Sequence, residues 1–270
     1  MAEVKPYVSK LFIYPIKSLD RVGLDRGVIL KQGGLKGDRE FAIVDESGQF
    51  VNGKRNSKVH RLRTQFDLAA NTVSLHVEGE PDQQTFHLET DQKALEAWLS
   101  RYFGVSVSIK HNLETGFPDD LESPGPTVIS TATLEAIASW YPDLDVEQIR
   151  LRLRANIEIA GVPPFWEDCL FATAEQVVDF QIGSVKFMGV NPCQRCVVVT
   201  RDAQTGEAYP QFQKTFVAKR QETLPAWAER SRFNHFYRLA VNTRLPASEE
   251  GKEICVGDRL IVNSDGKNLL

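Results

Sequence analysis

The chain has 270 residues, of which 42% are hydrophobic and 25% charged, and its 32 basic and 36 acidic side chains leave a net charge of −4. This length fits one large domain or two ordinary ones, with enough apolar side chains for a substantial core. A net acidic chain is not expected to bind nucleic acid or anionic membranes in general, because such binding needs a basic surface or stripe. An anionic ligand would therefore have to be held by a local cluster of cations.

No targeting or membrane segment is apparent in the sequence. The first twelve residues contain no apolar run followed by a small-residue cleavage site, and no stretch approaches the roughly 20 apolar residues of a spanning helix. The four cysteines, Cys169, Cys193, Cys196 and Cys255, are too few for a disulfide scaffold. We therefore expect a soluble protein in a reducing, cytoplasmic compartment.

Short segments with an apolar period of two dominate the first half of the chain and predict strands. In chain order these predicted strands cover residues 8–14, 27–30, 41–45, 65–69, 72–77, 85–88 and 105–110. A helix is predicted over residues 92–103, because apolar side chains recur at i, i+3, i+4 and i+7 from Leu95. The following segment, residues 112–126, is polar and rich in proline and glycine, which predicts a linker or lid.

The second half repeats this mixture of elements. Helices are predicted over residues 130–140, where Ser130 or Thr131 can cap the first turn, and more weakly over residues 223–230. Further strands are predicted over residues 157–160, 183–187, 197–200, 236–241 and 259–262. The fold class is therefore mainly β with a few helices (α+β), and we expect a β-barrel within it. No glycine-rich loop links a strand to a helix, so a dinucleotide or phosphate-loop motif is not indicated.

The segment Asn191-Pro-Cys-Gln-Arg-Cys196 contains a Cys-x-x-Cys pair with several ordinary interpretations. Structural zinc needs four ligands, and neither the other cysteines nor the five histidines show ligand spacing. A thioredoxin-type redox pair belongs at the start of a helix, whereas this pair precedes a predicted strand. A third interpretation is that both cysteines are buried and inert, and the pair alone leaves it open.

Arg195 favours a fourth interpretation, in which Cys196 is a metal ligand. A guanidinium beside a thiol favours the thiolate, which is the form that binds metals. Sulfur suits a soft metal. One thiolate holds a metal weakly, however, so the remaining ligands would have to come from a cofactor.

Two segments near the start of the chain could supply cations to an anionic ligand. Tyr14-Pro-Ile-Lys-Ser18 places Lys17 and Ser18 where a predicted strand ends, a position from which they could hold a phosphate or another oxyanion. A solvated lysine on a loop is the competing interpretation. Gly37-Asp-Arg39 leads into the strand predicted over residues 41–45.

A third cationic segment is Arg150-Leu-Arg-Leu-Arg154. Its alternation predicts an extended segment with all three arginines on one face, where they need anions or water. The competing interpretation is a salt-bridged face that uses Glu147 or Glu158.

In this order, the segments resemble one family. The chain is similar to MOSC-domain proteins with a preceding MOSC N-terminal region, the architecture of the mitochondrial amidoxime-reducing components and their bacterial relatives. The resemblance runs from about residue 8 to residue 262. It rests on the motifs LFIYPIKS, GDREFAIVD, STATLEAI, RLRANIEI, CQRCVVVTRDAQTGE and VGDRLIV.

The resemblance implies a molybdenum cofactor (Mo-molybdopterin) in which a pterin dithiolene supplies two sulfurs. The cysteine that follows the arginine in the family motif, here Cys196, would be the protein's ligand to the metal and its catalytic residue. The positions that match the family's cofactor contacts are Lys17, Ser18, Arg39, Arg154, Asn156, Gln194 and Arg195. Gln194 stands where relatives often carry serine.

The resemblance also implies a division of the chain. Residues 1–115 would form the MOSC N-terminal region and residues 116–270 the MOSC domain. Because the matched cations lie at residues 17, 39, 154 and 195, distant segments must converge. We therefore expect residues 1–39 to pack on the MOSC barrel and residues 40–105 to form a smaller β subdomain.

By analogy with the family, we expect a molybdenum-dependent oxidoreductase that reduces N-hydroxylated or N-oxygenated small molecules. The Cys-x4-Cys-x2-Cys spacing of a plant-type iron–sulfur domain is not present. Electrons should therefore come from a separate ferredoxin-, flavodoxin- or cytochrome b5-like protein. The alternatives are a molybdenum-cofactor carrier or sulfur-transfer accessory protein, without the pyridoxal-phosphate domain of a complete sulfurase, and a non-enzymatic β-barrel binding module. Neither a nucleic-acid nor a membrane partner is expected.

Overall fold

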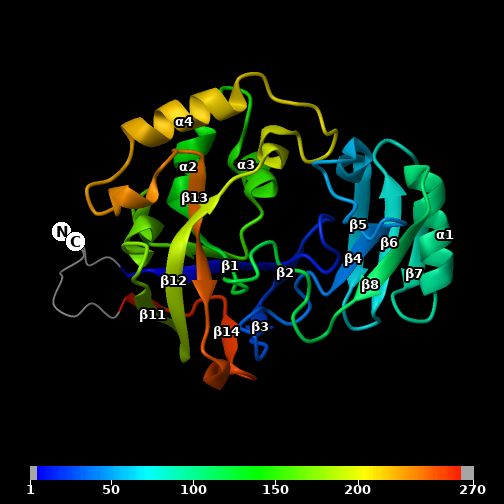
Figure 1. Cartoon of the computed structure of the whole chain (residues 1–270), viewed down its shortest axis with the longest axis horizontal. Helices are drawn as coiled ribbons and strands as arrows, with labels where there is room; N and C mark the ends of the chain where they lie inside the picture. Colours follow the sequence, from blue (N-terminus) through cyan, green and yellow to red (C-terminus); the bar gives the residue numbers. More distant parts are fainter. Residues whose placement is uncertain (1–4, 263–270) are drawn as a thin grey trace.

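The computed structural model describes residues 5–262 and is mixed α and β, mainly β, as the sequence predicts (Figure 1). The strands are β1 (Tyr7–Ile13), β2 (Val22–Leu24), β3 (Arg26–Val28), β4 (Phe41–Asp45), β5 (Leu62–Asp67), β6 (Thr72–Val77), β7 (Gln83–His87), β8 (Val107–His111), β9 (Val128–Ser130), β10 (Ile157–Ala160), β11 (Val178–Ile182), β12 (Val185–Gln194), β13 (Arg238–Arg244), β14 (Glu253–Cys255) and β15 (Leu260–Val262). The α-helices are α1 (Gln92–Phe103), α2 (Thr131–Ala138), α3 (Val146–Leu153) and α4 (Phe212–Glu222).

The largest sheet has the strand order β15-β11-β12-β13-β9-β10-β1-β2 and curls on itself. Its ends meet where Leu260 N donates to Pro6 O at 2.9 Å and Val8 N donates to Asp258 O at 2.9 Å. These bonds connect β15 to β1. The strands β15, β11, β12, β13, β9, β10 and β1 therefore close into a barrel, and β2 pairs with the outer edge of β1. The first strand of the chain is thereby built into the same sheet as strands of the second half.

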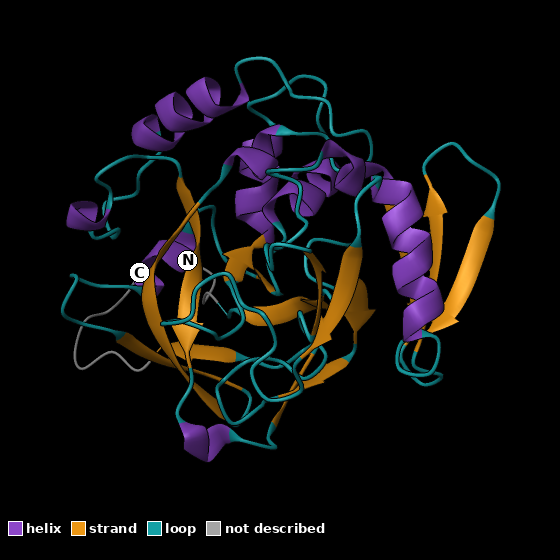
Figure 2. Ribbon diagram, turned by 45° about the vertical axis from the view of Figure 1, so that its right-hand side comes forward, coloured by secondary structure: helices purple, strands orange, loops and turns teal. Residues whose placement is uncertain are grey.

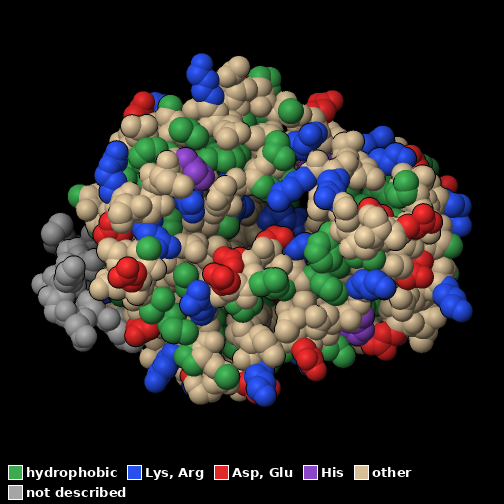
Figure 3. Space-filling model, viewed as in Figure 1, with side chains coloured by type: hydrophobic (Ala, Val, Ile, Leu, Met, Phe, Trp, Pro, Cys, Tyr) green, Lys and Arg blue, Asp and Glu red, His purple; other side chains and the backbone are tan. Residues whose placement is uncertain are grey.

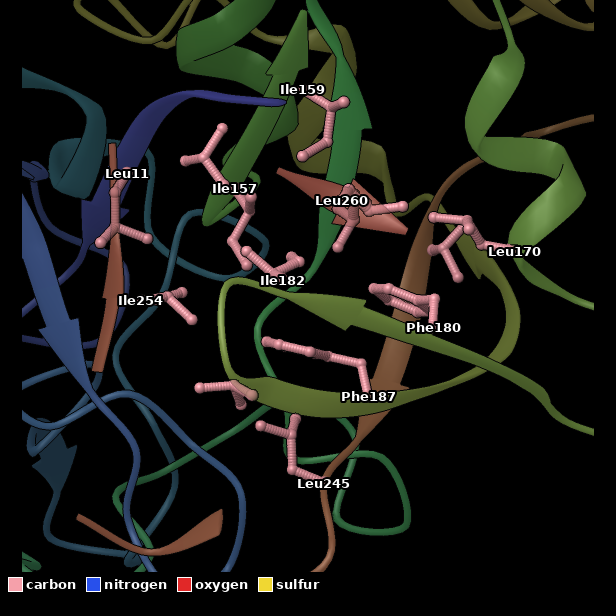
Figure 4. Packing of buried hydrophobic residues seen from close by; sticks show 14 of the residues in the cluster. Leu11, Ile157, Ile159, Leu170, Phe180, Ile182, Phe187, Leu245, Ile254 and Leu260 are labelled. Carbon is pink, nitrogen blue, oxygen red and sulfur yellow. The ribbon is translucent and has the colours of Figure 1, made fainter. Parts of the chain in front are cut away.

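The barrel is filled by side chains that alternate along its strands (Figure 4). On β11, Phe180 and Ile182 are fully buried while the residue between them is partly exposed. The ring of Phe180 stacks on that of Phe187 from β12, with 5.2 Å between the ring centroids. Period-two burial of large apolar side chains is what commits these segments to strands rather than helices.

A layer of helices, α2, α3 and α4, lies against one end of the barrel (Figure 2). The buried face of α4 presents Phe212 and Phe216, and the Phe212 ring stacks on Tyr141 at 4.5 Å between centroids. Helix α3 begins at a capping box in which Asp145 and Gln148 exchange hydrogen bonds with each other's backbone N–H. The cap fixes where the helix starts, and therefore where its last turn delivers its arginines.

A smaller β unit lies beside the barrel and has its own core (Figure 1). It consists of the β4–β8 pair, the antiparallel β5-β6-β7 sheet and α1, which buries Leu95, Leu99 and Phe103. The backbone of Ile16, just after β1, bridges that of Phe41 at the start of β4. This bridge joins the smaller unit to the exit of the first barrel strand.

Three predicted elements are wrong. Residues 197–200 form a 3-10 turn, η3 (Val197–Thr200), rather than a strand, because the chain leaves the sheet after Gln194 and Thr200 Oγ1 bonds back to Val197 O at 2.7 Å. The helix predicted over residues 223–230 is absent; α4 ends at Glu222. Residues 150–153 are helical rather than extended, because the capping box and tertiary packing override the alternating pattern.

Other predicted strands are present with shifted bounds, such as β5, which starts three residues before the predicted residue 65. Residues 112–126 carry neither helix nor strand, as predicted. Between residues 5 and 262, no helix has the length and apolar character needed to cross a membrane. Residues 1–4, where the segment inspected for a targeting signal begins, and residues 263–270 lie outside the described residues.

Three charged side chains are buried between the barrel and the helical layer. Arg220 on α4 pairs with Asp168, and both are almost fully buried. The neighbouring Glu167 accepts a hydrogen bond from Thr133 at 2.9 Å but is not paired with a cation in the described chain. Burial, reinforced by the charge of Asp168, raises the pKa of Glu167 to about 7.

The Glu167→Gln variant tests this burial through the pH dependence of stability. The folded-state pKa lies above the ordinary 4.5, so the wild type loses stability as the pH rises from about 4.5 to 7. We expect the variant to gain up to about 3 kcal/mol relative to the wild type over this interval. Urea unfolding of both proteins at pH 5 and pH 8 measures this gain. If the difference in the free energy of unfolding between the two proteins were the same at both pH values, the raised pKa of Glu167 would be contradicted.

Candidate functional site

Residues from both halves of the chain line one cavity of about 790 Å³. Its walls come from the segment after β1, residues 52–63 of the smaller unit, the loop before β9, the end of α3 and the end of β12. Figure 3 shows a hollow near the centre of one face, with Lys and Arg side chains deep within it. The cavity therefore lies where the smaller unit, the barrel and the helical layer meet.

The structure brings every sequence-predicted site residue to this cavity. The residues are Lys17, Ser18, Arg39, Arg154, Asn156, Gln194, Arg195 and Cys196. They come from four segments that are far apart in the sequence, as the predicted convergence requires.

Backbone N–H groups hold the exit of β1 against β4 and the segment before it, with backbone and side-chain acceptors. Tyr14 N donates to the Asp38 carboxylate at 2.8 Å, and Arg39 N donates to Tyr14 O at 2.8 Å. Lys17 N donates to Phe41 O at 2.7 Å. These bonds fix Lys17 and Arg39 side by side although more than twenty residues separate them. Lys17 is 8% exposed, so it is not the solvated loop lysine of the competing interpretation.

Three of the predicted site residues have left-handed backbone conformations. Ser18 has φ 74°, Arg39 has φ 51° and Arg154, which follows α3 as its C-cap, has φ 55°. Glycine is the residue that adopts this conformation without steric cost. Non-glycine residues held there are typical of functional sites, where the side chain matters more than backbone strain.

The Tyr14 ring organises the two arginines. Its centroid lies 4.0 Å from the Arg154 guanidinium carbon and 5.2 Å from that of Arg39. Burial raises the pKa of Tyr14 despite these cations, so the ring remains neutral. Burial and the charge of Arg39 both lower the pKa of Arg154, so a bound anion would relieve repulsion between the guanidinium groups.

Asp119, on the loop before β9, lies against these cations. Its carboxylate accepts from Lys17 Nζ at 2.5 Å, and Lys17 also donates to Phe117 O at 2.8 Å. The Asp119 side chain is 79% exposed and lines the cavity. Burial works against its charge, but Lys17 and Arg39 lower its pKa to about 2. Asp119 is therefore an anion at the position where the cations converge.

Asn156 has a structural task as well as a place in the cavity. Its side-chain Nδ2 donates to Phe12 O at 3.1 Å, and its Oδ1 accepts from Thr127 N at 3.2 Å. Asn156 O also accepts from Phe12 N at 2.8 Å. Because most of its hydrogen-bonding capacity joins β1 to the strands beside it, Asn156 has little more than one amide hydrogen left for a ligand.

Arg195 does not contact Cys196 in the way that the sequence suggested. Its Nη1 lies 3.3 Å from Cys193 Sγ, and its Nη2 donates to Leu153 O. The guanidinium that the sequence places beside Cys196 is therefore in contact with Cys193 instead. Cys196 is half-buried at the start of η3, and its carbonyl accepts from Tyr237 Oη at 3.4 Å.

The two cysteines lie at the end of β12 and at the start of η3, and both are free thiols. Cys193 lies on β12 beside a register irregularity of the strand, and Cys196 has φ −103° and ψ 175°. In the described chain, no group of three or more His, Cys, Asp or Glu residues could hold a metal. This disfavours a structural zinc site built from protein side chains.

The arginines of residues 150–154 divide between the two interpretations of that segment. Arg150 pairs with Glu147 and, at 2.5 Å, with Glu158, as the salt-bridge interpretation has it. Arg152 and Arg154 line the cavity instead. Arg150 and Arg152 are two positions apart on the helix and so point to different sides, whereas Arg154 follows the helix as its left-handed C-cap.

The cavity concentrates positive charge in an acidic chain. Nine of its lining residues are Lys or Arg and four are Asp: Lys17, Arg21, Arg39, Lys54, Arg63, Arg152, Arg154, Arg195 and Arg201 against Asp20, Asp38, Asp119 and Asp120. Within the described chain, buried Nε atoms of Arg152, Arg195 and Arg201 have no hydrogen-bond partner. Such groups are costly unless a ligand or water pairs with them.

Sequence reasoning missed several residues of the cavity. Tyr14 stands in the YPIKS motif, but nothing in the motif predicts its stacking role. Asp119, His60 and Arg201 lie on loops or beside turns, where the pattern carries no signal about which segments meet. The capping box before α3 could have identified that helix, and with it the direction of Arg152.

Comparison with known proteins agrees with this architecture. The family model of the MOSC N-terminal beta barrel domain matches residues 5–111, and that of the MOSC domain matches residues 127–261. Curated relatives are named molybdenum cofactor sulfurases. Those from Danio rerio and Caenorhabditis elegans are each 26% identical over 73% and 76% of this chain, and sulfurase 3 from Aedes aegypti is 32% identical over 75%.

The chain spans about 30% of the length of these relatives: 28%, 30% and 31%, respectively. Among solved structures, the YUAD protein from Bacillus subtilis aligns over 95% of this chain and 94% of its own, with 11% identity and a TM-score of 0.37. The two family models together account for nearly all of the described residues. The chain therefore belongs to the MOSC family, with a MOSC N-terminal beta barrel domain preceding its MOSC domain.

Proposed function

We propose that the chain binds a molybdenum cofactor in the cationic cavity, with Cys196 as the thiolate ligand, and that it reduces N-hydroxylated or N-oxygenated compounds. The observation that carries the proposal is the convergence of Lys17, Ser18, Arg39 and Arg154 with Cys196 in one cavity. MOSC family membership and the sulfurase names of the relatives support the link to this cofactor. We further propose that residues 1–115 and 116–270 act as two regions that jointly form the site.

The chemistry of the lining residues fits the cofactor. A pterin phosphate is dianionic, and arginines are suited to pair with it in a bidentate manner. Arg39 and Arg154, steadied by Tyr14, together with Lys17, would hold this phosphate. The unpartnered Nε of Arg195 would serve a polar edge of the pterin. A phosphate at this place would compete with Asp119 for Lys17.

The sulfur of Cys196 fits the remaining requirement. A soft thiolate suits molybdenum bound by dithiolene sulfurs. We assign the metal to Cys196 alone, because this is the position that matches the ligand of the family motif. Cys193, in contact with Arg195, would orient that guanidinium.

When bound, this cofactor supplies two-electron oxygen-atom transfer, which amino-acid side chains cannot supply. The chain's own residues bind and orient: the cations fix the anionic end, Cys196 fixes the metal end, and the cavity walls limit access of water. Reducing an N–OH group takes two electrons and two protons. We propose that a ferredoxin-, flavodoxin- or cytochrome b5-like protein delivers the electrons.

The second candidate is a molybdenum-cofactor carrier or sulfur-transfer accessory protein without redox turnover of its own. The observation that favours it is the name of the curated relatives, molybdenum cofactor sulfurase. Both candidates use the same cavity and predict bound cofactor. They differ in whether the loaded protein turns over substrate.

Cofactor analysis and a turnover assay separate these candidates. We expect protein from a cofactor-replete host to contain molybdenum and pterin in equal amounts, and to reduce benzamidoxime when reduced methyl viologen replaces the donor protein. Bound cofactor without turnover would support the carrier. Absence of both metal and pterin would contradict either candidate and favour a non-enzymatic binding module.

Cysteine variants test the metal ligand. Cys196→Ser is expected to abolish reduction of benzamidoxime and to change the Mo(V) electron paramagnetic resonance signal, because a hard hydroxyl replaces a soft thiolate. Cys193→Ser is the matched control and should keep most of the activity, since serine can still accept from Arg195. Equal loss in both variants would indicate that the two cysteines act as a pair.

Arg154→Gly tests whether Arg154 is held in its left-handed backbone conformation in order to bind the cofactor. Glycine relieves the left-handed backbone, a gain of about 1–2 kcal/mol, while the lost Tyr14 contact costs about 2 kcal/mol and the lost hydrogen bond from Arg154 to Leu19 O, 2.7 Å in the wild type, about 1 kcal/mol more. We therefore expect the free energy of unfolding to fall by about 1 kcal/mol, together with a large fall in molybdenum and pterin content. Arg154→Lys, which keeps the charge and the strain, is the control. Full cofactor content in Arg154→Gly would remove Arg154 from the binding site.

A further inference from the structure

We propose that Arg152, Arg201 and His60 form a second anion-binding subsite in the cavity, which takes a carboxylate on the small-molecule substrate. None of the three belongs to the residues assigned to the cofactor. They come from α3, from the segment after η3 and from the 3-10 turn η1 (Ser57–Arg61), and all line the cavity. The assignment of the ligand as substrate rests on the proposed reductase function.

Arg152 is a buried cation with weak compensation. The residue is 4% exposed, and its contacts are long: Nη1 to Val199 O at 3.4 Å and Nη2 to the Asp202 carboxylate at 3.5 Å. Its Nε is buried without a hydrogen-bond partner in the described chain. A guanidinium buried in this way is costly unless an anion completes its pairing.

Arg201 adds a second incompletely paired guanidinium. Its Nη1 donates to Gly206 O at 3.2 Å, and its Nε is buried without a partner. Between residues 5 and 262, it takes part in no ion pair with a carboxylate. Asp202, the adjacent acid, directs one carboxylate oxygen to Gln204 N and Thr205 N, at 2.9 Å each. The other carboxylate oxygen of Asp202 faces Arg152 at 3.5 Å, so both oxygens of Asp202 are directed to groups other than Arg201.

His60 is a buried imidazole within the same positive field, and in its neutral form its single N–H faces Gly53 O, so it offers an anion a second donor only when it is protonated. It is 6% exposed, and its Nε2 lies 3.4 Å from Gly53 O. Burial lowers its pKa, and Arg201, Arg154 and Arg63 lower it further. Arg63 itself is paired with Asp20 at 3.1 Å and donates to Ala203 O at 3.1 Å, so it fixes the wall rather than awaiting a ligand.

The position of the subsite relative to Cys196 indicates a substrate anchor. Cys196 is the N-cap of η3, Arg152 contacts Val199 within η3, and Arg201 follows η3 directly. An anion held here would bind next to the turn that presents Cys196. The cofactor phosphate, by contrast, is assigned to Lys17, Arg39 and Arg154. A substrate carrying a carboxylate could thus be held at one end while its N–OH group faces the metal.

The kinetic test compares benzamidoxime with 4-carboxybenzamidoxime on molybdenum-loaded protein, with reduced methyl viologen as the electron donor. We expect the carboxylated substrate to have a KM about tenfold lower, as one charge-assisted hydrogen bond gives. Arg201→Gln should remove this advantage without changing KM for benzamidoxime. Arg152→Lys should reduce it, because lysine keeps the charge but not the planar fork.

Arg150→Gln is the matched control. It removes an arginine from the same helix, but one paired with Glu147 and Glu158 outside the cavity. The control should keep the preference for the carboxylated substrate. Equal KM values for the two substrates in the wild type would overturn the subsite. So would an Arg201→Gln variant that weakens both substrates alike or loses molybdenum and pterin, since Arg201 would then serve the cofactor.

A binding test without turnover keeps the subsite separate from the reductase function. Benzoate is titrated into the protein while the ring signals of His60 are followed by NMR across pH. We expect benzoate to raise the pKa of His60 in the wild type and not in Arg201→Gln. This result in a protein that reduces no N-hydroxylated compound would refute the reductase and retain the subsite. An unchanged His60 titration would refute the subsite alone.

Discussion

The pairing of β1 with β10 is the constraint on which the cavity depends. Asn156 strengthens it by bonding to both the N–H and the carbonyl of Phe12, and it bonds Thr127 through the same side chain. The loop that leaves β1 carries Lys17, and the turn before β10 carries Arg154. A single strand pair thus sets the distance between cations 137 residues apart. If these strands separated, Lys17 and Arg154 would move apart, while the smaller unit would keep its own core.

Much of the fold could be predicted because its signals are local. Period-two burial identified most barrel strands, and the stripe from Leu95 identified α1 with the observed bounds, residues 92–103. Errors arose where two local signals conflict or tertiary contacts decide. The Val197–Thr200 segment is β-branched and so favours a strand, but η3 buries only Val199. Helix α4 was not predicted because the charged Arg220, which is buried in an ion pair with Asp168, interrupts the apolar face of the helix.

In the candidate site too, local motifs could be predicted from the sequence and long-range contacts could not. The family resemblance named eight positions, and all eight line the cavity. Side-chain directions could not be predicted, because they depend on which segment lies opposite: Arg195 contacts Cys193 rather than Cys196. Residues such as Arg201 and Asp119 belong to no motif and are brought in by long-range packing alone. The motifs therefore predicted which residues converge at the cavity, but they did not predict the other residues of its walls.

Asp119 has a consequence for how tightly any anion can bind. Because it is tethered to the chain, its carboxylate competes with incoming anions at a fixed, high effective concentration. The observed affinity of the cation cluster is the intrinsic affinity multiplied by the fraction of molecules in which Lys17 is free. Binding and release of the loop before β9 are thus thermodynamically linked. The same contact that lowers the pKa of Asp119 gives the cavity an internal counter-ion, which partly neutralises its buried cations.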